Sequence, residues 1–96
     1  MAADYYYADT ENGDHLDDPS EDALFMLLDD LEPDGNTFLT VRPADGAGWS
    51  VSVSLLDDGG FRVERGDPAR GEHAVYTTDD LSRIAGDLTI WMAGRT

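Results

Sequence analysis

The amino-acid sequence predicts an α+β fold of two layers, in which two helices cover one face of an antiparallel sheet of four or five strands. Residues 49–55 alternate without an error between large apolar side chains and serine, which is the two-residue period of a half-buried strand. Segments with helical spacing lie before and after this region, at residues 19–31 and 78–93. We therefore expect the element order β-α-β-β-β-β-α in a single domain spanning residues 1–96.

Local signals predict the first strand and the first helix. Asp4–Ala8 contains three tyrosines, which favour a strand, whereas Thr10–Asp17 is polar and predicts a loop. Asp18 is placed to cap a helix, Pro19 suits the first helical position, and Glu21 follows three residues after the cap. The apolar stripe of this helix consists of Leu24, Leu27, Leu28 and Leu31. The Pro-Asp-Gly sequence that follows is expected to end it.

The sequence of the middle of the chain predicts strands separated by turns. Asp57–Gly60 is typical of a hairpin turn, because it joins two alternating segments and ends in two glycines. The expected segments are an extended run at Asn36–Arg42, a loop at Pro43–Gly48, strands at Trp49–Leu55 and Phe61–Arg65, a loop at Gly66–Gly71 and a last strand at Glu72–Thr77.

A second helix is expected to close the fold. Thr78 can cap it, and Asp79 and Asp80 would then lie in its first turn, where negative charge is favourable at the positive end of the helix dipole. Helical spacing is kept by Leu81, Ile84, Ala85, Leu88, Trp91 and Met92. Gly94 is expected to end this helix.

Charge is the most unusual property of the sequence. The formal net charge is −15, from 21 acidic residues and six arginines, and there is no lysine. Such a field repels nucleic acid and anionic membranes, and it steers a cationic protein toward the surface. A basic protein is therefore the expected partner. The alternative is that the acidity serves solubility, as in a halophilic type of protein.

The acidic residues are not spread evenly along the chain. Residues 1–41 contain twelve of them and no arginine, whereas all six arginines follow. This N-terminal third is the predicted binding surface, and its three consecutive tyrosines are expected to supply at least one exposed anchor. The candidate partner-binding residues are Tyr5, Tyr6, Tyr7, Asp9, Glu11, Asp14, Asp17, Asp18, Glu21, Asp22, Asp29 and Glu32.

No set of residues in the sequence predicts catalysis. There is no cysteine, and the two histidines, His15 and His73, lie far apart in the sequence and belong to no metal-binding spacing. With 21 carboxylates, chance pairs of acidic residues are certain. We therefore expect neither an enzyme nor a cofactor.

One segment of the sequence partly matches the pattern of a calcium-binding loop. Asp30, Glu32, Asp34 and Gly35 occupy positions 1, 3, 5 and 6 of an EF-hand-like loop, but position 12 is Val41 in place of the bidentate glutamate. The pattern therefore predicts no specific metal site, and a calcium-binding domain remains an alternative to a binding protein.

The start of the sequence predicts a cytoplasmic protein. It has no basic segment followed by an apolar run of signal-peptide length, and Ala23–Leu28, its longest apolar stretch, is too short to span a bilayer. The absence of cysteine fits a reducing compartment.

The three tyrosines, the acidic loop after them, Pro19 and the Leu27-Leu28 pair together resemble segments of the Imm1 family of bacterial toxin-immunity proteins. This resemblance covers about the first third of the chain and implies a protein that neutralises a toxin. The first functional hypothesis is thus an immunity protein that occludes the active site of a basic, nuclease-like toxin. The alternative is a phage- or plasmid-encoded nucleic-acid mimic that inhibits a host defence enzyme, with carboxylates in place of phosphates.

Overall fold

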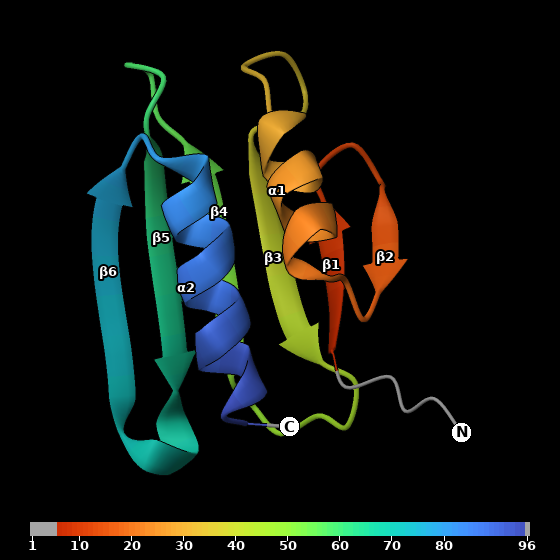
Figure 1. Ribbon diagram of the computed structural model, residues 1–96, viewed down its shortest axis with the longest axis vertical. Coiled ribbons are helices and arrows are strands. Elements are labelled where there is room, and N and C mark those ends of the chain that lie inside the picture. The colour runs from red at the N-terminus through yellow and green to blue at the C-terminus, as the bar shows by residue number, and fades with distance from the viewer. Residues whose placement is uncertain (1–5, 96) are drawn as a thin grey trace.

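The computed structural model describes residues 6–95 and shows an α+β fold of two layers (Figure 1). Six strands form one antiparallel sheet within these residues, in the spatial order β2-β1-β3-β4-β5-β6, and both helices lie on the same face of it. The elements are β1 (Tyr6–Thr10), β2 (His15–Asp17), α1 (Glu21–Asp29), β3 (Phe38–Pro43), β4 (Ser50–Leu55), β5 (Phe61–Asp67), β6 (Glu72–Thr78) and α2 (Leu81–Ala93), with a 3-10 turn at Pro68–Arg70.

The prediction of four or five strands was wrong, because the sheet has a further short strand, β2. Its three residues lie in a segment predicted to be a loop, and all three are exposed. They form a strand because they pair with β1, with Tyr7 opposite Asp17 and Asp9 opposite His15. β2 is therefore a strand because of its pairing with β1 at the edge of the sheet. The composition of its own three residues does not indicate this pairing.

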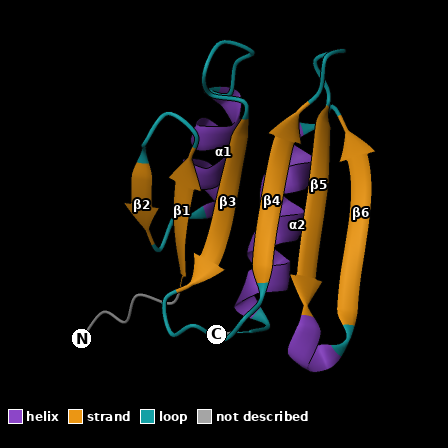
Figure 2. Ribbon diagram, turned by 180° about the vertical axis from the view of Figure 1, so that it is seen from behind, coloured by secondary structure: helices purple, strands orange, loops and turns teal. Residues whose placement is uncertain are grey.

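The core lies between the sheet and the helices. On β4 the valines Val51 and Val53 are buried beneath the helices, while the serines that alternate with them face the other way. Figure 2 shows this second face of the sheet, which neither α1 nor α2 covers. The buried apolar residues are Tyr6, Ala8, Leu24, Leu28, Leu31, Leu39, Val41, Trp49, Val51, Val53, Phe61, Val63, Ile84, Ala85, Leu88 and Met92.

The structure corrects the start of α1. Its N-cap is Ser20, whose hydroxyl oxygen accepts a hydrogen bond from the backbone N–H of Ala23 at 3.2 Å. Asp18 does not cap the helix, because its own backbone N–H donates to the carbonyl of Tyr6 and keeps it at the sheet. The predicted capping positions of Pro19 and Glu21 were therefore wrong by two residues. The helix also ends at Asp29, two residues before the predicted end.

The second helix is shifted in the same direction. Asp80, predicted in the first turn, is the N-cap, and its carboxylate accepts from the backbone N–H of Arg83 at 3.1 Å. Thr78, the predicted cap, instead ends β6, because it pairs with Phe61 in the sheet.

The predicted hairpin at Asp57–Gly60 is confirmed. Leu55 pairs with Phe61 across the turn, and the backbone N–H of Leu56 donates to the carbonyl of Gly60 at 2.7 Å. Gly59 has a φ of +88°, a conformation that favours glycine. The returning strand extends to Asp67, past its predicted end, because its last residues continue to pair with β6.

Candidate functional site

The division of charge along the sequence becomes a division across the sheet. The acidic half is defined as residues 6–43, which form β1, β2, α1 and β3, and it holds eleven acidic residues and one arginine. The balanced half is defined as residues 61–95, which form β5, β6 and α2, and it holds six acidic residues and five arginines. Their formal charges are −10 and −1, and Figure 1 shows them on opposite sides of β4.

The two halves also differ in how their carboxylates are compensated. In the balanced half, four of the six described carboxylates form ion pairs with arginine or histidine. In the acidic half, Asp9 and Asp17 pair with His15, and the other nine described carboxylates form no ion pair. Uncompensated surface charge of one sign produces a potential of several kT. The acidic half therefore carries most of the field of this protein.

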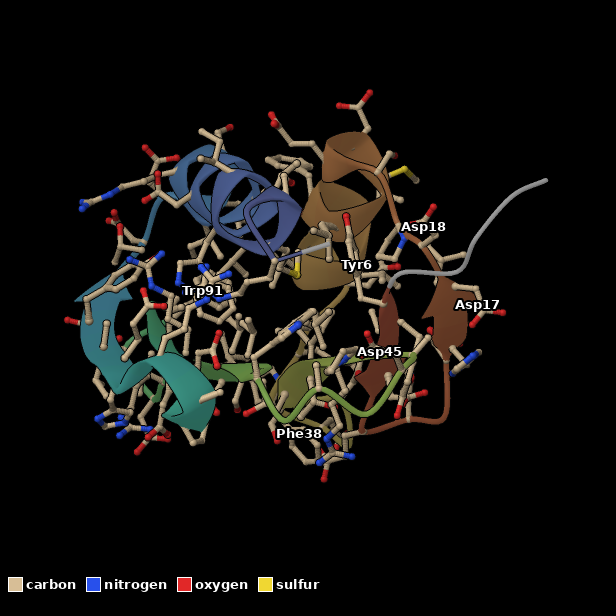
Figure 3. The ribbon with its side chains drawn as sticks, turned by 90° about the horizontal axis from the view of Figure 1, so that it is seen from below. Tyr6, Asp17, Asp18, Phe38, Asp45 and Trp91 are labelled. Carbon is tan, nitrogen blue, oxygen red and sulfur yellow. The ribbon has the colours of Figure 1, made fainter. Side chains whose placement is uncertain are left out.

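The three predicted tyrosine anchors have different environments. Tyr5 lies outside the described residues. Tyr6 is buried between the sheet and α1 (Figure 3), where its hydroxyl donates to the carbonyl of Pro19 at 3.3 Å and its ring contacts Trp49 edge-on. Burial, and then the charge of Asp18, raise the pKa of Tyr6 above its usual 10.0. Tyr6 is thus a core residue in this structure, whereas Tyr7 is half-buried beside His15 on the uncovered sheet face.

His15 joins two of the predicted carboxylates on that face. Its Nδ1 lies 2.6 Å from Asp9 and its Nε2 lies 2.9 Å from Asp17, and all three side chains are exposed to solvent. The hydrogen bonds that the ring makes to the carboxylate of Asp9 and then to that of Asp17 raise the pKa of His15 above 6.5. A protonated ring donates to both carboxylates, so this cluster stabilises the β1–β2 pair at pH values below the raised pKa.

A titration tests this cluster. Replacing both carboxylates, Asp9→Asn and Asp17→Asn, is expected to lower the pKa of His15 toward 6.5, because the acceptors that favour the charged ring lose their charge. The measurement is the pH dependence of the His15 ring proton shifts by NMR. In the native protein the contribution to stability is complete below pH 6.5 and is lost as the pH rises through the folded-state pKa. The signals of His73, which contacts Glu64 instead, should be the same in both proteins; an unchanged His15 pKa would contradict the cluster.

Glu11 and Asp14 belong to the turn between β1 and β2. One carboxylate oxygen of Glu11 accepts from both the backbone N–H and the hydroxyl of Thr37, at 2.8 and 2.7 Å. These bonds lower the pKa of Glu11 below its usual 4.5. The carbonyl of Asp14 accepts from the N–H of Thr10 at 2.9 Å, and its carboxylate is exposed and unpaired. Glu11 thus fastens the turn to the start of β3, whereas Asp14 contributes charge.

The remaining predicted carboxylates lie on and around α1. Asp18 is exposed at the edge of the sheet with a φ of +49° (Figure 3), and Glu32 forms an isolated bridge with Asn36 after the helix. Glu21, Asp22 and Asp29 are exposed on α1 itself. The structure therefore exposes the three helical carboxylates along the length of α1, on the outer surface of the acidic half.

Sequence reasoning missed two apolar residues on this surface. Phe25 and Met26 keep 36% and 66% of their area exposed, although they lie in the middle of α1. Both fall outside the leucine stripe, and that signal was available in the sequence. The exposed surface of α1 therefore carries two apolar side chains interspersed with the carboxylates of Glu21, Asp22 and Asp29, so apolar area and negative charge are both available to a partner there.

The calcium-like loop adopts a turn closed by protein groups. The side-chain N–H of Asn36 donates to the carbonyl of Asp30 at 3.1 Å, and the N–H of Glu32 donates to the carbonyl of Asn36. Among residues 6–95, no group of three histidine or acidic side chains has the geometry to hold a metal ion. In the same range no helix is long and apolar enough to cross a membrane.

Comparison of the chain with protein-family models, with curated proteins and with solved structures found no match.

Proposed function

We propose that this protein is an inhibitor that acts in the cytoplasm by binding a basic protein, in the manner of an immunity protein that occludes the active site of a nuclease-like toxin. The observation that carries this proposal is the presence, in residues 6–43, of nine carboxylates that form no ion pair. The resemblance of the first third to segments of the Imm1 family points to the same role and stays a prediction, since no family model matches the chain.

The distribution of charge argues against solubility as the reason for the acidity. A halophilic type of surface needs acidic residues on all sides, because each exposed part must stay hydrated. Here the balanced half has a formal charge of −1 and pairs most of its carboxylates. A field concentrated in one half, which holds −10 of the net charge of −15, gives a preferred direction of approach for a basic partner.

The structure also changes which residues serve as anchors in this proposal. Tyr6 is occupied in the core, so the apolar contact passes to Phe25 and Met26 on α1. Methionine adapts to irregular surfaces, and aromatic residues dominate binding energy at interfaces. The carboxylates around them accelerate encounter, while the apolar pair slows dissociation.

Replacing the apolar pair tests this division of roles. Met26→Ala and Phe25→Ala are each expected to raise the dissociation rate constant about tenfold, the equivalent of about 1.4 kcal/mol. The association rate constant should change little, because no charge is removed. Both constants can be measured by surface plasmon resonance with the partner that co-purifies from native cells.

The matched control is Phe38→Ala, which removes an equally exposed aromatic side chain from the uncovered face of the sheet. Both rate constants should match those of the unmodified protein. A large effect of Phe38→Ala, with none for Met26→Ala, would move the binding surface to the uncovered sheet face.

A further inference from the structure

The two edges of the sheet are built differently. The edge strand β2 has three residues, two of which form the Asp17–His15 ion pair. The opposite edge strand β6 has seven residues and pairs with β5 alone among the described elements, as Figure 2 shows. Short and charged edges resist pairing with another chain, whereas long edges invite it. The edge at β6 is therefore the one open to a further strand.

The sequence of β6 lacks the devices that protect such edges. It contains no proline and no lysine, and its one acidic residue, Glu72, lies at the end, where Arg95 donates a hydrogen bond to its carboxylate. The strand is rich in Thr, Val and Tyr, which favour sheets. Val75 lies at its centre and is 43% exposed. The backbone groups on its outer side thus form a free template.

An antiparallel pair of two β6 strands is self-complementary. Pairing about Val75 places Val75 opposite Val75, and it places His73 opposite Thr77. Ala74 then lies opposite Tyr76, so the smallest side chain of the strand meets the largest. No two acidic residues face each other, because Glu72 lies opposite Thr78. This register therefore avoids the like-charge contacts that destabilise strand pairs.

The distribution of charge favours a second copy of this chain as the strand that pairs with β6. Two chains of charge −15 repel each other in most orientations. Joining them at β6 brings together the balanced halves, of charge −1 each. With strands about 4.8 Å apart, the β3 strands of the two copies would be separated by about 34 Å, several times the screening length of about 8 Å in physiological salt. The acidic halves then scarcely interact.

Two hollows lie beside β6 on the face of the sheet that the helices cover. Arg65, Trp91 and Ala74 line a hollow between α2 and the start of β6, and Ile90, 75% exposed, lines a second hollow that shares Arg65 and Trp91. In a pair related by a two-fold axis at Val75, both copies bring these hollows to the junction. The uncovered apolar area of the balanced half thus gathers at the same edge.

We propose that this protein forms a symmetric dimer in which β6 pairs antiparallel with β6 of a second copy, giving one continuous sheet with the acidic halves at its two ends. This assembly depends on the balanced half and is independent of the partner proposed for the acidic half.

Sedimentation equilibrium over a range of protein concentrations tests the dimer. The native chain, of 10.5 kDa, is expected to show twice that mass at high micromolar concentration. Val75→Lys places two like charges opposite each other at the axis and is expected to raise the dissociation constant at least about tenfold. Leu16→Lys is the matched control, because Leu16 is a similarly exposed apolar residue on the other edge strand, and it should leave the dimer intact.

Amide hydrogen exchange of the native protein gives a second readout that needs no variant. In the dimer all inner amides of β6 are hydrogen-bonded, so those that point away from β5 should become protected as concentration rises. A monomeric mass throughout the range, or β6 amides that exchange equally fast at every concentration, would overturn the proposal. A Val75→Lys protein with the native dissociation constant would also overturn it.

Discussion

Replacing Val53 with aspartate is expected to leave the chain unfolded. Val53 has no exposed area and lies between Leu39 and Val63 in the centre of the sheet. A carboxylate at this place would be buried without a partner, and the cost of burying an unpaired charge exceeds the stability of about 5–15 kcal/mol that a domain of this kind has. Far-UV circular dichroism and NMR dispersion in native buffer are the measurements.

The control for this result lies on the same strand. Ser50→Asp introduces the same side chain at an exposed position on the uncovered face. It should fold and melt cooperatively, close to the native protein. A Val53→Asp variant with a native-like melting transition would show that the core is not where the structure places it.

Removing the guanidinium of Arg95 is expected to cost about 3–5 kcal/mol of unfolding free energy. Its side chain is 7% exposed and its Nε donates to the carboxylate of Asp67 at 3.1 Å, where Asp67 is itself 6% exposed. The guanidinium also stacks 3.6 Å from the ring centre of Trp91 and donates to that residue's carbonyl. Arg95→Ala would leave the carboxylate of Asp67 buried with Arg70, 3.8 Å away and largely exposed, as its remaining cation.

Chemical denaturation with urea measures this loss. Arg83→Ala is the control, because its pair with Asp87 is exposed and 3.6 Å long, and such pairs contribute about 0–1 kcal/mol. The double variant Arg95→Met with Asp67→Leu should recover much of the stability, since it removes both charges. Equal losses for Arg95→Ala and Arg83→Ala would show that the buried pair has no special weight.

Periodicity predicted the parts of this fold that depend on local sequence. The alternation of residues 49–55 and the leucine spacing of α1 both appear in the structure as buried faces. The limits of the elements were less predictable, because Asp18 and Thr78 are held by strands that lie far from them in the sequence. The same reason explains β2, which exists only through its pairing with β1.

The sequence predicted where the acidic residues of the candidate site gather. It predicted less well which contacts the side chains of the site make. The gathering of acidic residues before residue 42 was visible in the sequence and corresponds to one side of the sheet. Alternation alone could not say that Tyr6, rather than Tyr7, faces the core, since both phases of the strand fit the pattern. The bond between Glu11 and Thr37, 26 residues apart, left no local signal either.

The binding of a basic partner by the acidic half is the central claim, and the association rate constant tests it most directly. Glu21, Asp22, Asp29 and Glu32 should be replaced together by lysine, with the quadruple variant of Asp45, Asp57, Asp58 and Asp79 to lysine as a control of equal charge change outside the acidic half. The rate is measured by stopped flow or surface plasmon resonance at two salt concentrations, with the partner that co-purifies from native cells. The first variant is expected to associate at least about tenfold more slowly and with a flatter salt dependence, and the control much less so. Equal rates for the two variants, or no change in either, would contradict a binding surface on the acidic half.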